Sequence, residues 1–447
     1  MKIRFREIVS KNNESIVSVI TIVLIAFSRL LASDYYSYML FIMAALIVIY
    51  PVSGIVPLYV SSLSSNYFAI TVGIGIDRII AIAFIIGVLL RYVNRKVKGE
   101  KSWFLIIALI PVSFIFSYFF AISCEVQSVI WLTNGLSYLI FISSLFVELD
   151  ARQIVLIKHL FQTAAVVIIV VLFCDTLLNG TLVGGRITIT EDVNNNNFAM
   201  MTSQLGMLSL SLFFLNRKRK QNYIYLGLAL MALFLTILSG SRTSLIAMFV
   251  TSFILLLLGD KRKGYKKAFV IALVLLLSYC MLDWAMSNYS ELGERLNIGA
   301  IIHSGGSGRL DVIKLEIKEI IPKHWLFGIG PSTIYETVAI RSYDSRLASS
   351  SHNIVIAMLT QFGVFGLIVH WIFYYKIISK LKEAYISCRL YKKENVVLVP
   401  LTLLIAALVN GIGENIFAER FFWVILSICI IFFNYVKTLK DTDRISE

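Results

Sequence analysis

The chain carries little charge for its length, and this scarcity excludes a soluble globular protein. Of its 447 residues, 15% are charged and 58% are hydrophobic, whereas soluble domains usually carry about 25% charged residues. Apolar runs of about 20 residues recur along nearly the whole sequence, which is the length that a helix needs to cross the hydrocarbon core. The alternating segments of about ten residues that build a membrane β-barrel are absent. The sequence therefore predicts an all-α, polytopic bundle of transmembrane helices.

Further absences limit the chemistry. The five cysteines are scattered without CxxC or metal-ligand spacing, and we expect most of them to be small buried side chains. No DxD pair occurs on the expected outer face, and no Walker or other nucleotide-binding loop occurs in the sequence. We therefore predict that the protein uses no metal and no cofactor. The net charge of +14 comes mostly from short loops, which indicates membrane topology rather than nucleic-acid binding.

Loops rich in lysine and arginine indicate the direction of each span. The most basic loops, which we expect in the cytoplasm, are 91–101, 217–220, 261–267 and 376–393. Counting the crossings gives about 12 spans, or about 14 if the broken apolar stretch 36–65 crosses twice. That stretch is compatible with one helix, two short helices or a re-entrant hairpin. The chain then divides into membrane helices at 1–286, one long extracytoplasmic loop at 287–353, and C-terminal helices with a cytoplasmic tail at 354–447.

Two arginines follow glycines at expected helix starts on the outer face. Arg242 begins the helix after Gly240, and Arg309 follows the flexible segment 304–308 and precedes an amphipathic run that Pro322 ends. A helix start exposes unpaired backbone N–H groups and the positive end of the dipole, so it favours an anion. Arginine adds a planar, permanently charged fork suited to phosphate oxygens. Together the two arginines predict a diphosphate site, although an arginine reaching lipid head groups would give the same pattern.

His352 lies at the outer start of the next apolar helix, near Ile354. A helix start disfavours an imidazolium, so we expect this histidine to stay neutral. A neutral imidazole can take a proton from a sugar hydroxyl as a general base. Considered alone, the residue is equally compatible with a histidine that only caps the helix or forms a hydrogen bond at the interface.

Other polar residues on the same face are candidates for binding phosphate or sugar hydroxyls: Arg186, Asn197, Ser241 and Asn353. The asparagine run that ends at Asn197 is equally compatible with capping of the helix at Phe198. Glu414 and Glu419, in a short outer turn, are weaker candidates for binding an acceptor.

Asp77 and Arg78 place opposite charges within an apolar run. An ion pair inside a span is costly and usually faces the protein interior or a water-filled cavity. A structural pair near the interface and a pair that contacts a ligand are both compatible with the sequence.

In their order along the chain, these motifs resemble the O-antigen polymerase and O-antigen ligase superfamily of bacterial membrane glycosyltransferases. The resemblance covers 186–367 well, and the N-terminal third only as membrane helices. It rests on five short motifs: Ser-Gly-Ser-Arg242-Thr, Ser-Gly-Arg309, Leu326-Phe-Gly-Ile-Gly330, His352-Asn353 and Gln361-Phe-Gly-Val-Phe-Gly366.

The resemblance implies a GT-C-like fold in the bacterial cytoplasmic (inner) membrane. It implies a metal-independent, inverting transfer of glycan from undecaprenyl diphosphate to an acceptor sugar hydroxyl at the outer face. Carried onto this chain, Arg242 and Arg309 would stabilise the leaving diphosphate, and His352 would activate the acceptor. The expected ligands are an undecaprenyl-diphosphate-linked oligosaccharide and the lipid bilayer, with no nucleic acid. Such enzymes often work beside a chain-length regulator and a flippase, but no residue here indicates that contact.

The motifs leave three functions open. We favour a repeat-unit polymerase over an O-antigen ligase because no feature of the sequence indicates a lipid A–core acceptor. A transporter of lipid-linked oligosaccharides belongs to a different class, and it would place its charges at mid-membrane, often on inverted repeats. Here the arginines lie at one face and no internal repeat is seen, so glycan transfer is the preferred interpretation.

Overall fold

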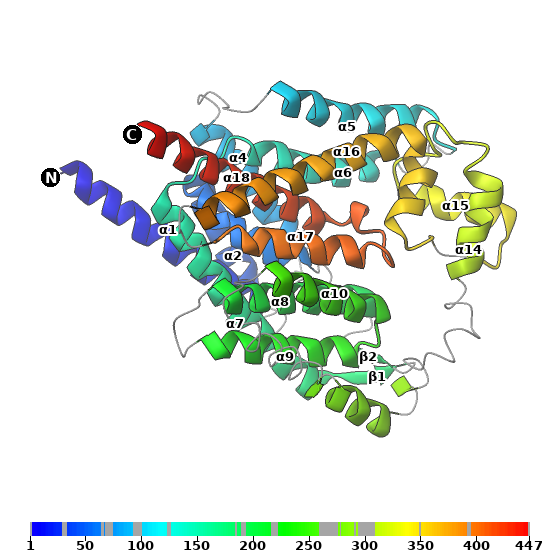
Figure 1. Cartoon of the computed structure of the whole chain (residues 1–447), viewed down its shortest axis with the longest axis horizontal. Coiled ribbons are helices and arrows are strands. Elements are labelled where there is room, and N and C mark those ends of the chain that lie inside the picture. Colours follow the sequence, from blue (N-terminus) through cyan, green and yellow to red (C-terminus); the bar gives the residue numbers. More distant parts are fainter. Residues whose placement is uncertain are drawn as a thin grey trace.

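The computed structural model describes residues 2–28, 34–63, 67, 75–92, 101–122, 127–183, 186–188, 194–215, 222–258, 276–277, 279–289, 292–293, 309–347, 350–390 and 395–445. In this part of the chain most residues are helical, and the prediction of an α-helical bundle is confirmed (Figure 1). The described residues also include one two-stranded antiparallel hairpin of β1 (Thr181–Val183) and β2 (Arg186–Thr188).

The described helices and strands follow in this order along the chain. The first half of the chain contains α1 (Lys2–Ala26), α2 (Asp34–Ile49), η1 (Pro51–Gly54), α3 (Ile55–Leu63), α4 (Ile76–Tyr92), α5 (Lys101–Phe119), α6 (Gln127–Ser144) and α7 (Ala151–Asn179). The second half contains α8 (Asn195–Leu215), α9 (Tyr223–Leu238), α10 (Arg242–Leu258), α14 (Arg309–Leu315), η4 (Glu316–Ile320), α15 (Thr333–Tyr343), α16 (Ile354–Leu390), α17 (Leu398–Asn410), η5 (Ile416–Ala418) and α18 (Arg420–Ile445).

Several helices are suited to a membrane. Three described helices are long and apolar enough to cross one by length and composition: Ala151–Asn179, Asn195–Leu215 and Ile354–Cys388. Shorter apolar helices occur at Asn13–Ala26, Tyr36–Ile49, Pro51–Leu63, Ile107–Phe119, Tyr223–Leu238, Arg242–Leu258, Leu398–Asn410 and Arg420–Val436. These apolar helices indicate a membrane protein, and a bundle of about 12 to 14 spans stays a prediction from hydropathy and loop charge.

The broken stretch 36–65 forms two short helices, which is one of the arrangements that its sequence allows. The helix α2 ends before Pro51, which opens the buried turn η1 and leads into α3. Proline has no N–H to continue a helix, so it separates the two.

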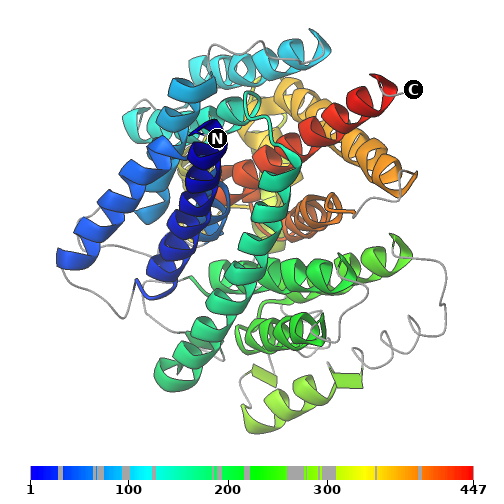
Figure 2. The same cartoon turned by 90° about the vertical axis from the view of Figure 1, so that its left-hand side faces the viewer.

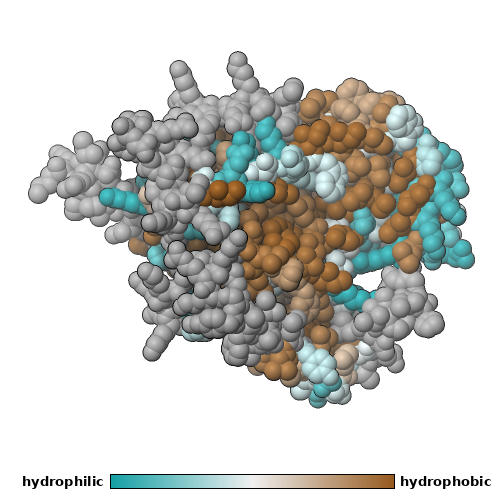
Figure 3. Space-filling view, viewed as in Figure 1, coloured by the Kyte–Doolittle hydropathy of each residue, from teal (hydrophilic) through white to brown (hydrophobic). Residues whose placement is uncertain are grey.

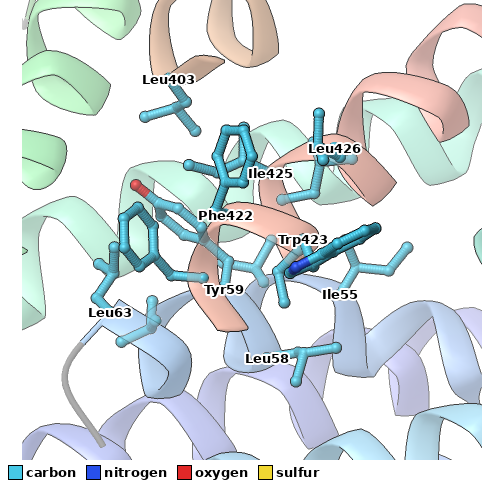
Figure 4. Packing of buried hydrophobic residues seen from close by; sticks show 14 of the residues in the cluster. Ile55, Leu58, Tyr59, Leu63, Leu403, Phe422, Trp423, Ile425 and Leu426 are labelled. Atoms are coloured by element: carbon cyan, nitrogen blue, oxygen red, sulfur yellow. The ribbon is translucent and has the colours of Figure 1, made fainter. Parts of the chain in front are cut away.

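The bundle core forms where α3 meets α18 (Figure 4). Tyr59 of α3 and Phe422 of α18 are both fully buried there. Their neighbours in this region are Ile55, Leu58, Leu63, Leu403, Trp423, Ile425 and Leu426. Because lipid tails are as apolar as these side chains, close van der Waals packing holds such helices together.

Asp77 forms a buried ion pair with Arg420, which ties the start of α4 to the start of α18. Its sequence neighbour Arg78 is exposed, so the pair suggested by adjacency is not the one that forms. An isolated buried charge is very unfavourable, whereas a paired one is tolerated. Among the interpretations of Asp77, the structure favours the structural pair.

The arrangement of the helices separates two ends of the bundle. Both termini lie at one end, and α14 and α15 lie at the other (Figure 1). In the same view the surface is hydrophobic over the middle of the bundle and hydrophilic where α14 and α15 lie (Figure 3). Seen from the end that carries the termini, α8, α9 and α10 form a group, and α17 lies between this group and α18 (Figure 2).

The segment 309–347 forms a small unit of its own at that end. It contains α14, the π-helical turn η4 and α15. As predicted, the amphipathic run after Arg309 stops at Pro322, because regular helix ends at Ile320 and turns follow.

This unit is joined to α16 inside the apolar run that begins at Ile354. Gly363, with φ of 66° and ψ of −170°, breaks the helix there. The break frees backbone groups of α16. The N–H of Ile329 donates to the carbonyl of Thr360 at 2.9 Å, and the N–H of Val364 donates to the carbonyl of Trp325 at 2.8 Å.

Gly328 and Gly363 are needed for the close backbone contact between the unit 309–347 and α16. A Cβ on Gly328 would lie 2.3 Å from the backbone of Gln361, and a Cβ on Gly363 would lie 2.3 Å from the carbonyl oxygen of Leu326. Both glycines also have positive φ, which side chains disfavour. The Leu326–Gly330 and Gln361–Gly366 motifs are therefore two halves of one backbone joint.

Candidate functional site

The site is organised around Glu414, in the turn that joins α17 to η5. One oxygen, Oε1, accepts a hydrogen bond from Nη2 of Arg309 at 3.1 Å. The other, Oε2, lies 2.9 Å from Nδ1 of His352. A single carboxylate thus brings together the loop arginine and the histidine that the sequence singles out, which lie 105 and 62 positions before it.

Arg309 reaches the turn through a second contact as well. Its Nη1 donates to the carbonyl oxygen of Gly413 at 2.8 Å. The exposed fraction of the side chain is 30% for Arg309, 27% for His352 and 14% for Glu414. The side chains of Arg309 and His352 are therefore partly exposed, while the carboxylate that they share is more buried.

The start of α10 packs against the same turn. Arg242, partly buried, is the first residue of α10, and the next residue, Thr243, touches Gly413 so closely that a Cβ there would lie 2.2 Å from its hydroxyl oxygen. One residue further, the hydroxyl of Ser244 donates to Oδ1 of Asn410 at 3.0 Å. The starts of α10 and α14 therefore both contact the segment 410–414, and a diphosphate site shared by Arg242 and Arg309 stays a prediction.

His352 has an unusual backbone. It is the one non-glycine residue in the described part of the chain with positive φ, at 49°. Because a carboxylate only accepts hydrogen bonds, the contact with Glu414 assigns the proton to Nδ1 of His352. The lone pair then lies on Nε2, where it can accept a proton. The carboxylate of Glu414 thus lies beside the ring in the structure, a contact that the helix-start argument from sequence does not include.

Asn353 and Ser241 are both used within the fold. The amide of Asn353 donates to the carbonyl of Ile412 at 2.9 Å, and its oxygen caps α16 by accepting the N–H groups of Val355 and Ile356. Ser241 is buried, and its hydroxyl donates to Ser244. These contacts hold the turns in place, so a role for either residue in binding substrate stays a prediction.

Arg186 and the asparagine run lie at the same end of the bundle. Nη1 of Arg186 donates to Oδ1 of Asn196 at 3.2 Å, which ties β2 to the first turn of α8. The N–H of Asn196 donates to the side chain of Asn194 at 2.9 Å. This arrangement fits the interpretation that the asparagine run caps the helix. Asn197, the last residue of the run, is partly buried. Substrate binding by Arg186 and Asn197 stays a prediction.

Glu419 supplies a second carboxyl to the turn. Burial raises its pKa to about 7, and the charge of Glu414 adds to this effect. The sequence names Glu414 and Glu419 only as weak candidates for acceptor binding, and it gives no sign that Glu414 contacts Arg309 and His352. The sequence feature that could have identified Glu414 is its position as a lone acidic residue between Gly413 and Asn415, in a short turn between two apolar helices.

The described residues contain no group of three or more His, Cys, Asp or Glu side chains that could hold a metal ion. The chemistry available at the turn is that of one imidazole, two carboxyl groups and the guanidinium of Arg309, with Arg242 at the adjoining helix start. These groups can bind an anion and move a proton.

Residues 225–370 match the family described as O-antigen ligase. The matched segment runs from α9 into α16 and contains Arg242, Arg309 and His352, whereas Glu414 lies beyond it. No curated protein matches the chain.

Proposed function

Because residues 225–370 are a domain of the O-antigen polymerase and ligase superfamily, we propose that the protein is a membrane glycosyltransferase that polymerises glycan repeat units. The donor is an oligosaccharide on undecaprenyl diphosphate, and the acceptor is a sugar hydroxyl. The reaction takes place at the outer face of the bacterial cytoplasmic membrane.

The observation that carries this proposal is the carboxylate of Glu414 between His352 and Arg309. A carboxylate on Nδ1 fixes the imidazole tautomer and stabilises the imidazolium that forms when Nε2 takes a proton. The acceptor oxygen then bonds to the anomeric carbon as the bond from that carbon to the diphosphate oxygen breaks. The diphosphate leaves with the bonding electrons, and the acceptor proton passes to Nε2 of His352.

The guanidinium of Arg309 has N–H donors left that can bind this leaving group. A guanidinium has five N–H donors, and two of them contact Gly413 and Glu414. The other three suit phosphate oxygens, and Arg242 adds a second permanent charge from the adjoining helix start. Charge that builds on the leaving diphosphate is thereby stabilised, which is a large contribution to catalysis in such sites. In this proposal neither a metal nor a cofactor takes part, and the transfer proceeds with inversion at the anomeric carbon.

The placement of the site supports an extracytoplasmic reaction. The site lies at the end of the bundle opposite to both termini (Figure 1). The helix α16 runs from this end toward the termini, and its later turns carry Lys376, Lys380 and Lys382. Basic residues favour the cytoplasmic side, so Arg309 and His352 face outward in this proposal.

The family description names a ligase, so a ligase is the second candidate. The two reactions share the donor and differ in the acceptor, which is another lipid-linked repeat unit for a polymerase and lipid A–core for a ligase. The polymerase is preferred because no feature of this chain indicates a lipid A–core acceptor.

Glycan transfer by the purified protein tests the proposal. The protein in detergent receives undecaprenyl-diphosphate-linked repeat units without metal or nucleotide, and the products are separated on a gel. The polymerase predicts a ladder that Arg309→Ala and His352→Ala abolish. Matched controls on the same unit are Arg346→Ala, whose side chain is 88% exposed, and His324→Ala, and both should keep the ladder.

The other outcomes identify the alternatives. Transfer that appears only when lipid A–core is added makes the protein a ligase. If neither acceptor is used and the protein moves the lipid across liposomes, the enzyme proposal is wrong and the protein is a transporter. A ladder that survives both Arg309→Ala and His352→Ala would place the chemistry elsewhere.

A further inference from the structure

Glu336 of α15 is completely buried, and its carboxylate joins segments on both sides of His352. Oε1 accepts hydrogen bonds from the backbone N–H of Ser351 at 2.7 Å and from its hydroxyl at 2.9 Å. Oε2 accepts a hydrogen bond from Nε2 of Gln361 at 2.9 Å. Ser351 directly precedes His352, and Gln361 lies two positions before the break at Gly363. One side chain of the loop therefore fixes the chain before and after the histidine.

His352 is held from its other side by the turn that carries Glu414. The amide of Asn353 donates to the carbonyl of Ile412, and the N–H of Ile354 donates to the carbonyl of Gly411 at 2.8 Å. Between these two anchors His352 adopts φ of 49°. A side-chain-bearing residue keeps such a conformation only when its surroundings impose it. We therefore expect the loss of either anchor to let His352 relax from this conformation and move its ring away from Glu414.

A second buried carboxyl supports Glu336. Glu316 of η4 is fully buried and faces Glu336, with the uncharged side chains of Ser351 and Thr360 beside it. Two carboxylates buried this close do not both ionise. Burial, and then the charge of Glu336, raise the pKa of Glu316 to about 9. Glu316 therefore favours its neutral form, whereas the oxygens of Glu336 accept three hydrogen bonds, two from Ser351 and one from Gln361.

We propose that Glu336 is a positioning residue that holds His352 in the conformation that presents its ring to Glu414. The inference rests on the proposed role of His352 as a general base. In this proposal the buried carboxylate of Glu336 affects the rate of proton transfer through the conformation of His352.

Glu336→Leu tests this assignment, because leucine fills similar space and accepts no hydrogen bond. It leaves the donors of Ser351 and Gln361 without an acceptor, and we expect kcat to fall by about 10- to 100-fold, since a small misplacement of a catalytic group has that effect. The KM for the donor should change by less than about twofold, because diphosphate binding does not involve Glu336. Glu336→Gln keeps an acceptor for Ser351 and should restore most of the rate.

Two further variants separate positioning from loss of folding. Ser351→Ala removes only the hydroxyl donor and should lower kcat several-fold. Its matched control is Ser342→Ala on α15, whose hydroxyl bonds only to its own helix at Ala339. Glu316→Gln keeps a neutral donor beside Glu336 and should retain the wild-type kcat at pH 7.

Chemical modification of His352 tests its position without depending on glycan transfer. Diethylpyrocarbonate modifies accessible imidazoles, and mass spectrometry gives the modification rate of His352 relative to that of His324, which lies in the unit 309–347. Glu336→Leu and Ser351→Ala should change this ratio several-fold, while Ser342→Ala should not. A wild-type ratio and a wild-type kcat in both variants would overturn the inference. A changed ratio in a protein without transfer activity would refute the proposed function and leave the positioning role standing.

Discussion

Replacement of Glu414 by glutamine is the sharpest perturbation of the site, because it keeps the size of the side chain and removes one acceptor oxygen. Arg309 and the proton on Nδ1 of His352 each require an acceptor, and the amide of glutamine has only one. If its NH2 group faces His352, the histidine must accept at Nδ1, so its proton moves to Nε2. The wrong tautomer is then presented to the acceptor sugar.

The expected size of the effect follows from these contacts. Loss of general base catalysis lowers kcat by about 10²- to 10⁴-fold. Binding of the donor should persist or tighten, because a negative charge is removed beside Arg309. Initial rates of transfer at saturating and limiting donor give kcat and KM separately.

Two results would refute this reasoning. The first is a Glu414→Gln variant with kcat within twofold of wild type. The second is an equal loss in the matched control Glu419→Gln, which removes a carboxyl from the same turn without touching the histidine contact. Either result would mean that the carboxylate of Glu414 does not set the state of His352.

Three other predictions concern stability and pH. Because the pKa of Glu316 is raised to about 9, the free energy of unfolding should fall by up to about 1.4 kcal/mol per pH unit between the ordinary carboxyl pKa and pH 9. Thermal unfolding in detergent should show this slope in wild type but not in Glu316→Gln, and equal slopes would contradict it. Gly363→Ala should lower the free energy of unfolding by at least about 1–3 kcal/mol, because a side chain is strained at its positive φ and the added Cβ would meet the backbone of Leu326. The matched control Gly227→Ala, which has open space around it, should be neutral or stabilising by up to about 1 kcal/mol. Asp77→Asn should cost about 3–5 kcal/mol by leaving Arg420 buried without its partner, and an unchanged unfolding temperature would show that the pair does not form.

The local features of the site could be predicted from sequence. Arg309 and His352 each stand at a helix start marked by polar or glycine residues, and such starts favour anions whatever the tertiary fold. The basic loops indicate which ends of the apolar runs lie together. These two arguments suffice to place the arginine and the histidine on one face of a helical membrane protein.

The contacts between distant segments could not be predicted in this way. Glu414 lies 62 positions after His352, and no periodicity relates a turn between two helices to a loop so far away. Asp77 has an oppositely charged neighbour in Arg78, yet it pairs with Arg420 because tertiary packing brings α4 to α18. The break at Gly363 lies inside an apolar run that is long enough to span the membrane, so hydropathy alone predicts an unbroken helix.

The most direct test of the central claim is a double-mutant cycle between His352 and Glu414, measured as single-turnover release of undecaprenyl diphosphate from the donor. If the carboxylate acts through the histidine, His352→Ala combined with Glu414→Gln should be no slower than His352→Ala alone, because the two residues form one unit. If instead the losses of the two single variants multiply in the double variant, the two residues act independently and the proposed site is wrong.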